Sequence, residues 1–275
     1  MPTTIYGRTE KTAASAPTPA TAGVPGDHWR DTSSNVVYRC LDATPSAAIW
    51  APINGYGYTS ASLHSPIALW HLDGGLTDAV GSLDLSVGAG SAVYSSFGGR
   101  KAFRFTGASY LERAANDAAL TITGDLTVAM VMSHLNPFAV NVPISFGGDA
   151  GSAAENILFS WATNAAGGLT HTHHSGTRSA QTHTTVDGYI GGGWGQHVCA
   201  VRGSNTITWY VDGILVGATS SALTAAAGGG SSRLIVGAAE DAGSKFLGAI
   251  SDVAIYNTAL TAAQVRAQSL RTVGR

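Results

Sequence analysis

Charged side chains are scarce in this chain of 275 residues. Asp, Glu, Lys and Arg make up 12% of it, about half of the roughly 25% that is usual in globular domains. The net charge of −2 gives no electrostatic reason to expect nucleic acid as a partner. Hydrophobic residues make up 44%, so the chain can bury a sizeable core. Its polar surface must therefore consist mainly of Ser, Thr, Asn and Gly.

Cysteine and long apolar segments are scarce as well. The two cysteines, Cys40 and Cys199, cannot make a disulfide framework, and we expect two free, buried thiols. The first residues lack the apolar stretch of a secretory signal, and no apolar run approaches the roughly 18 to 20 residues that span a bilayer. We therefore expect a protein that is made in the cytoplasm, is not exported by the usual route and is not inserted in a membrane.

Short strands joined by tight turns dominate the chain from residue 67 onward. Apolar and polar residues alternate in segments about 8–12 residues apart, the spacing of a sandwich or barrel. Asp212-Gly213 is the best short-range hairpin signal. The only convincing helix is C-terminal, where Thr261 and Gln264 form a capping box. The predicted fold class is all-β, with two packed sheets.

Shorter segments precede this body. The first stretch is rich in Thr, Ala and Pro and cannot bury a core. The next contains Trp29, Tyr38 and Trp50 at a spacing that predicts two or three short strands. About 28 residues are too few for a stable lone core, so this module is expected to pack on something else. The predicted organisation is an extended arm over 1–25, a small β module over 26–54, a linker over 55–66 and the sandwich over 67–275.

Five pieces of the body follow one another in the order and at the spacing of a known family. They are "IALWHLDGGLTDAVGSLDL", "KAFRFTGASYLE", "LTITGDLTVAMVM", "WGQHVCAVRGSNTITWYVDGILVG" and "FLGAISDVAIYNTALTAAQVRA". With them, the span from about 67 to 270 resembles a laminin-G-like, concanavalin-A-type jelly roll. The resemblance implies a two-sheet antiparallel sandwich. Within it, we expect Gly248 to admit a close backbone approach and Asp252 to accept backbone hydrogen bonds.

The stretch "GDHWRDTSSNVVYRC", followed by "AAIW", also has a counterpart. It resembles a short module common near the N-terminus of bacteriophage fibre and virion-surface proteins. A fainter likeness to small chitin-binding modules departs from their spacing. The first resemblance implies a particle-anchoring module that carries Trp29, Tyr38 and Trp50. The alternative is that these aromatics form only the module's own small core.

Candidate metal ligands are acidic residues in two loops. Jelly rolls of this class often hold Ca²⁺ through Asp, Asn and carbonyl oxygens in rim loops. The segments "LDGGLTDAVGSLD" and "GGDAGSAAEN" offer Asp73, Asp78 and Asp149 as calcium ligands. Neither segment matches a defined calcium loop, and turn-forming roles for these acids are the alternative.

Catalytic patterns are missing. Glucanases with this fold place paired carboxylates in a Glu-x-Asp-x-x-Glu strand, because retaining hydrolysis needs a nucleophile and an acid about 5 Å apart. The chain has four glutamates, Glu10, Glu112, Glu155 and Glu240, and none has that spacing. We expect no enzymatic activity.

Four of the nine histidines fall within "THTHHSGTRSAQTH", from His171 to His183. The segment predicts a hairpin with His171 and His173 on one face and His174 on the other. The alternatives are a plain polar face, a ligand-binding or subunit face, and a transition-metal site. A glycan needs hydrogen-bonding groups and an aromatic platform. The candidate carbohydrate-binding residues are Trp161, Asn164, His171, His173, His183 and Trp194.

Together these features predict a virion surface protein. A jelly roll without an export signal, behind a phage-fibre-like module, fits a chain that leaves the host cytoplasm on a particle. The expected partners are capsid or tail proteins, host surface polysaccharide and further copies of the chain, with a trimer favoured. The alternatives are a purely structural capsid decoration and a polysaccharide-degrading enzyme with an unrecognised active site.

Overall fold

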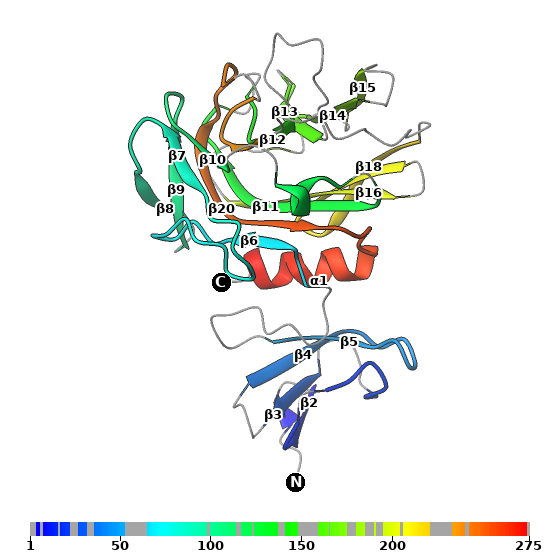
Figure 1. The fold of residues 1–275 in the computed structure, drawn as a ribbon. Coiled ribbons are helices and arrows are strands. Elements are labelled where there is room, and N and C mark those ends of the chain that lie inside the picture. Colours follow the sequence, from blue (N-terminus) through cyan, green and yellow to red (C-terminus); the bar gives the residue numbers. More distant parts are fainter. Residues whose placement is uncertain are drawn as a thin grey trace. The chain divides into compact units, whose positions relative to one another are not determined.

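The computed structural model divides the chain into two compact units (Figure 1). One unit combines Met1–Ser65 with Thr261–Gly274, and the other comprises Pro66–Leu260. Among the described residues, no helix is long and apolar enough to cross a membrane. The structure describes residues 4–5, 8–15, 17–22, 27–31, 36–52, 65–97, 100–113, 117–122, 124–136, 141–147, 159–164, 166–174, 180–184, 190, 195–203, 206–220, 233–239 and 242–273.

The first unit contains a five-stranded sheet in sequence order. The strand β2 pairs with β3 in parallel, and the other neighbouring pairs are antiparallel. The extended arm predicted over 1–25 is therefore wrong for residues 4–5 and 8–13, because their backbone groups pair within this sheet. These residues do not show the alternation of a strand in the sequence, since their side chains are mostly polar. The strands are β1 (Thr4–Ile5), β2 (Arg8–Ala13), β3 (His28–Asp31), β4 (Val36–Asp42) and β5 (Ile49–Pro52).

The aromatic residues of this unit form a small core. Trp50 is 2% exposed, and its ring meets the edge of Trp29 at 5.9 Å between centroids. Tyr38 and Cys40 are buried beside them. The Trp29 indole donates to Ser15 O at 2.9 Å. Tyr38 and Trp50 thus have little surface for a direct contact with another protein. They form the module's own small core, as the alternative stated above has it.

The C-terminal helix begins with the predicted capping box. The helix α1 spans Ala262–Val273. The Gln264 N–H donates to Thr261 Oγ1 at 3.3 Å, and the Thr261 N–H donates to Gln264 Oε1 at 2.7 Å. The helix contacts β5 within the first unit, whereas the range predicted for the jelly roll, 67–275, includes this helix.

The second unit is an antiparallel sandwich of two sheets, which confirms the predicted fold class (Figure 1). The seven-stranded sheet has the order β15-β14-β13-β12-β19-β10-β7, and the eight-stranded sheet β18-β17-β16-β11-β20-β9-β8, with β6 paired to β20. Strands distant in sequence, such as β11 and β20, lie side by side, as a jelly roll requires. A short 3₁₀ helix spans Ala118–Leu120.

The first sheet comprises β7 (Ser86–Ala89), β10 (Tyr110–Arg113), β12 (Ile144–Gly147), β13 (Phe159–Thr163), β14 (Leu169–His174), β15 (Ala180–Thr184) and β19 (Arg233–Val236). The second comprises β6 (Ala68–Trp70), β8 (Tyr94–Phe97), β9 (Arg100–Thr106), β11 (Leu126–His134), β16 (Gln196–Gly203), β17 (Thr206–Val211), β18 (Ile214–Ser220) and β20 (Leu247–Tyr256).

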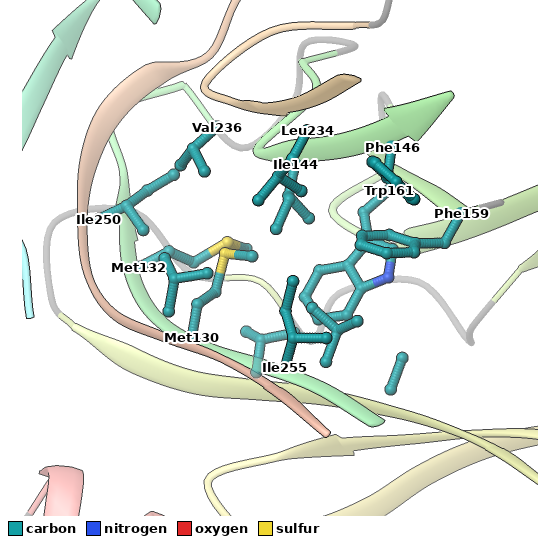
Figure 2. Packing of buried hydrophobic residues seen from close by; sticks show 14 of the residues in the cluster. Met130, Met132, Ile144, Phe146, Phe159, Trp161, Leu234, Val236, Ile250 and Ile255 are labelled. Atoms are coloured by element: carbon teal, nitrogen blue, oxygen red, sulfur yellow. The ribbon is translucent and has the colours of Figure 1, made fainter. Parts of the chain in front are cut away.

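The inner faces of the two sheets meet in one apolar core (Figure 2). Met130 and Met132 of β11 point toward Ile144 of β12 and Leu234 of β19, and none of the four is more than 1% exposed. Because side chains alternate along a strand, every buried residue of this core assigns its sequence neighbours to the outer face. That alternation fixes which residues of the seven-stranded sheet can meet a ligand.

Three details of the jelly roll test local expectations. Asp212 and Gly213 both have positive φ, at 52° and 76°, as the predicted Asp-Gly hairpin between β17 and β18 requires. A Cβ at Gly248 would lie 2.2 Å from Ser133 O, which confirms the close approach. Cys199 and Cys40 are both buried and do not form a disulfide, and burial raises the pKa of the Cys199 thiol.

Asp252 does not play the role expected of it. The prediction that its side chain accepts backbone hydrogen bonds is wrong, because its carboxylate faces two side chains. Oδ2 pairs with Arg100 Nη1, and Oδ1 lies 2.8 Å from His71 Nδ1. The Asp252 residue is 6% exposed and has a φ of 48° in the middle of β20. Its backbone N–H donates to His71 O at 3.2 Å. Asp252 therefore links β20 to the start of β9 and to the end of β6.

Candidate functional site

The histidine-rich segments form neighbouring antiparallel strands, as the sequence predicts. In the ladder between β14 and β15, His171 stands opposite His183 and His173 opposite Gln181. The connection between the strands and the side chains of His173, His174 and His183 lie outside the described residues. The described side chain of this group is therefore that of His171.

His171 and Trp161 face the core, so their predicted role in an exposed carbohydrate site is wrong. Trp161 is fully buried and pairs with His171 across β13 and β14; His171 is 1% exposed. The ring centroid of Trp209, from the other sheet, lies 4.9 Å from that of Trp161 and 6.3 Å from that of His171. A ring enclosed in this way has no face to offer to a sugar.

The outer face of the same strands bears small polar side chains instead. Ser160 and Ala162 of β13 and Thr170 and Thr172 of β14 are half-buried and alternate with core residues. Ser160 pairs with Thr172, so their hydroxyl groups lie opposite each other, and Thr170 adds a hydroxyl opposite the methyl group of Ala162. The signal was available in the sequence, since Leu169 is apolar and assigns positions 171 and 173 to the inner face.

Asn164 has a structural role at the turn after β13. Its Oδ1 accepts hydrogen bonds from the backbone N–H of Gly168 at 2.7 Å and of Ala166 at 2.9 Å. This arrangement holds the short connection between β13 and β14. Trp194, the remaining candidate for the carbohydrate site, lies outside the described residues, as does the candidate calcium ligand Asp149.

The outer face continues across the seven-stranded sheet in one register row. From β13 the row passes through Ser145 of β12 and Ile235 of β19. It then reaches Glu112 of β10 and Ser86 of β7. Ser145 and Ile235 are fully buried, which divides the accessible part of the face into two ends.

The second end of the face, over β7, β10 and β19, contains the aromatic and charged groups. Tyr110 and Glu112 are half-buried on β10, and they alternate with the buried Leu111. Arg233 Nη1 lies 3.0 Å from Glu112 Oε2, with the two side chains 23% and 26% exposed. Ser86 donates from Oγ to Glu112 O at 3.2 Å. The end combines an aromatic ring, an ion pair of zero net charge and a hydroxyl.

Asp78 is a turn residue in the described structure. Its two carboxylate oxygens accept hydrogen bonds from the backbone N–H of Leu69, Val80 and Leu83 at 3.0 to 3.2 Å. Asp73 is exposed on the same loop. Among the residues that the structure describes, no group of three or more His, Cys, Asp or Glu side chains could hold a metal ion. The turn role, offered as the alternative to calcium ligation, accounts for Asp78.

Two histidines of the jelly roll are held neutral by burial. Burial lowers the pKa of His134 to about 4. Its Nδ1 accepts the Asn136 N–H at 3.0 Å, so the ring proton sits on Nε2, 3.3 Å from Thr163 Oγ1. Burial likewise lowers the pKa of His197 to about 4, with Asp252 acting in the opposite direction. Both groups are part of the scaffold, and both make it sensitive to acid.

A comparison with protein-family models decides the family. Residues 105–266, more than half of the chain, match the model described as the Concanavalin A-like lectin/glucanases superfamily. The chain belongs to this superfamily. As the superfamily's name indicates, it includes both sugar-binding proteins and enzymes. A search of curated protein sequences gave no match.

Solved structures of the superfamily fold are similar to the jelly roll at low sequence identity. Domain 4 of AbnA, a GH43 extracellular arabinanase from Geobacillus stearothermophilus, solved in complex with arabinotriose, is 16% identical with a TM-score of 0.56; the match covers 74% of this chain and 97% of that one. The binding domain of Paraclostridial Mosquitocidal Protein 1 is 12% identical with a TM-score of 0.59; the match covers 74% of this chain and 52% of that one. The receptor binding domain of a botulinum neurotoxin C/D mosaic serotype is 11% identical with a TM-score of 0.57; the match covers 76% of this chain and 51% of that one. The chain thus spans about half of the toxin domains, and at these identities the likeness shows the fold.

Proposed function

We propose that this protein is a carbohydrate-binding component of a virion or virion-like particle. In this proposal the jelly-roll unit binds glycans of a host cell surface through the outer face of its seven-stranded sheet. The unit that contains residues 1–65 attaches the protein to the particle. The protein acts by binding and not by catalysis.

The observation that supports glycan binding most directly is the composition of the outer face. Ser160, Thr170 and Thr172 offer hydroxyl groups at one end of this face, and Glu112 with Arg233 offers a balanced charge pair at the other. Polyhydroxylated ligands need many hydrogen-bonding partners and little net charge. One similar structure is an arabinanase domain solved with arabinotriose, which is consistent with this choice of ligand.

The attachment role rests on the organisation of the chain and on the likeness of "GDHWRDTSSNVVYRC" to phage-fibre modules. The first unit has its own sheet and its own small core, which supports a role separate from that of the jelly roll. Its surface, and not the enclosed Tyr38 and Trp50, would meet a capsid or tail protein. We expect the displayed protein to be a trimer, which light scattering of the purified full chain measures.

Two experiments test this function separately. A glycan array with the full chain tests the binding role: dose-dependent binding to at least one glycan supports it, and an empty array favours a purely structural decoration. Cryo-EM of particles from the native source tests the attachment role. Density for residues 1–65 against a head or tail protein supports attachment, whereas particles without the chain contradict it. Release of reducing ends from host capsule would instead indicate an enzyme.

A further inference from the structure

Tyr110 lies on the outer face of the seven-stranded sheet in an arrangement that the glycine opposite it makes possible. A Cβ added to Gly88 of β7 would lie 2.1 Å from Tyr110 Cε2, 2.7 Å from Cδ2 and 2.8 Å from Cζ. The phenol ring therefore rests directly over the Gly88 backbone. The β7–β10 register also shifts beside Gly88, since Tyr110 pairs with Ala89 and Leu111 with Val87. The ring is half-buried, so it keeps an accessible surface.

The ion pair stands next to this ring on the same face. Glu112 is two residues from Tyr110 on β10, and side chains two apart on a strand share a face about 7 Å apart. Arg233 of β19 reaches Glu112 Oε2 at 3.0 Å. The carboxylate has a second oxygen, Oε1, and the guanidinium has several N–H donors in a fixed plane. The pair therefore offers an acceptor and donors on the face that carries Tyr110, with Glu112 between the ring and Arg233.

We propose that Tyr110, Glu112 and Arg233 form the specificity-determining end of the glycan site and that they bind an uncharged pyranose residue. The apolar C–H face of the pyranose stacks on the Tyr110 ring, and two neighbouring hydroxyls of the sugar bond to Glu112 and Arg233. Gly88 acts as a positioning residue, because it lets the ring lie against the sheet. This inference rests on the proposed function and names the class of ligand.

The charges of the site select the neutral sugar. The acid and the base cancel, and they already satisfy one another at 3.0 Å. A carboxylated or sulfated sugar would have to compete with Glu112 for Arg233 and would meet the glutamate's negative charge. A neutral sugar needs no such exchange, since its hydroxyls both donate and accept. An aromatic ring beside a few well-placed polar groups is the usual composition of a small-molecule site.

A structural explanation of the ring must also be tested. An aromatic side chain laid over a glycine in a neighbouring strand can simply stabilise the sheet. In that case the removal of the ring would lower the melting temperature and leave glycan binding unchanged. Binding and melting must therefore be measured on the same variants.

The test compares six full-length variants with the wild type on an array that carries matched neutral, sialylated and sulfated oligosaccharides. Tyr110→Ala removes the stacking surface, and Gly88→Ala displaces the ring without the removal of any polar group. The double variant combines them. Tyr94→Ala is the matched control, because Tyr94 is an exposed tyrosine of the other sheet, on β8.

We expect the wild type to prefer neutral glycans, and Tyr110→Ala and Gly88→Ala each to weaken binding by about tenfold, the loss expected for one aromatic contact. The double variant should bind no more weakly than Tyr110→Ala, because Gly88 acts only through the ring. Tyr94→Ala should bind like the wild type. Glu112→Gln should weaken binding, while Tyr110→Phe should retain it.

The outcomes separate the two claims. If the wild type binds glycans and Tyr110→Ala binds them equally well, this inference is overturned and the proposed glycan binding stands. A preference of the wild type for acidic glycans has the same consequence. Wild-type protein that binds no glycan overturns both. If Tyr110→Ala melts too early to be assayed, Gly88→Ala and Tyr110→Phe decide, since Gly88→Ala should weaken binding and Tyr110→Phe should not.

Discussion

The buried carboxylate of Asp252 is the most exacting test of how the jelly roll is held together. It is 6% exposed, its partner Arg100 is 11% exposed, and the pair joins the start of β9 to the middle of β20. The substitution Asp252→Asn removes the charge and keeps the shape. Asparagine also tolerates the positive φ of 48° at this position, so the backbone adds no strain.

The expected loss follows from the burial of the pair. Removal of one partner of a buried ion pair costs about 3–5 kcal/mol, because the other charge stays buried without compensation. Since Arg100 keeps some contact with water, we expect the lower figure, about 3 kcal/mol. For a unit of this size that corresponds to a fall of roughly 6–12 °C in Tm.

Urea unfolding of the full chain, followed by tryptophan fluorescence, measures this free energy. Glu112→Gln is the control, because it breaks a pair whose side chains are 26% and 23% exposed and should cost at most about 1 kcal/mol. The double variant Arg100→Met with Asp252→Asn should recover part of the loss, since no charge is then left alone. A loss below about 1 kcal/mol for Asp252→Asn would contradict this prediction, because losses of that size are typical of ion pairs that are exposed to water.

Three further predictions concern the scaffold. Because burial lowers the pKa of His197 from 6.5 to about 4, the unfolded chain binds the proton more readily. The free energy of unfolding should therefore fall by up to roughly 3 kcal/mol as the pH decreases through this range, and His197→Leu should flatten that slope in denaturation at several pH values. Gly248→Ala, whose Cβ would lie 2.2 Å from Ser133 O, should destabilise by about 1–3 kcal/mol. Gly124→Ala, with no atom within 4 Å of the added Cβ, should leave Tm unchanged. Thr261→Ala removes the N-cap of α1 and should cost about 1 kcal/mol, visible as a lower Tm in circular dichroism.

The fold could be predicted from the sequence because its signals are local and repeated. Alternating strands, the Asp212-Gly213 turn and the capping box at Thr261 each fix a short segment, and the order of the five pieces fixed the family. The strands β1 and β2, within the predicted arm over residues 1–25, could not be predicted because β2 obtains its place from its non-local pairing with β3, which polar side chains do not indicate.

The candidate site was harder to predict because burial is a property of the whole sandwich. The four histidines from His171 to His183 indicate a polar hairpin, but polarity alone does not determine which face of a strand is exposed. The core residues Leu169 and Trp161 indicate the buried face, and His171 lies on that face. The second end of the face could not be predicted, since Glu112 and Arg233 are far apart in sequence and meet only because β10 pairs with β19.

In the function proposed above, the outer face of the seven-stranded sheet binds a neutral glycan. The most direct measurement is a crystal structure of the full chain with the best array oligosaccharide bound. We expect a pyranose ring stacked on Tyr110, with its hydroxyls on Glu112 and Arg233. A sugar bound in the rim loops or on the eight-stranded sheet, with Tyr110 uncovered, would contradict it.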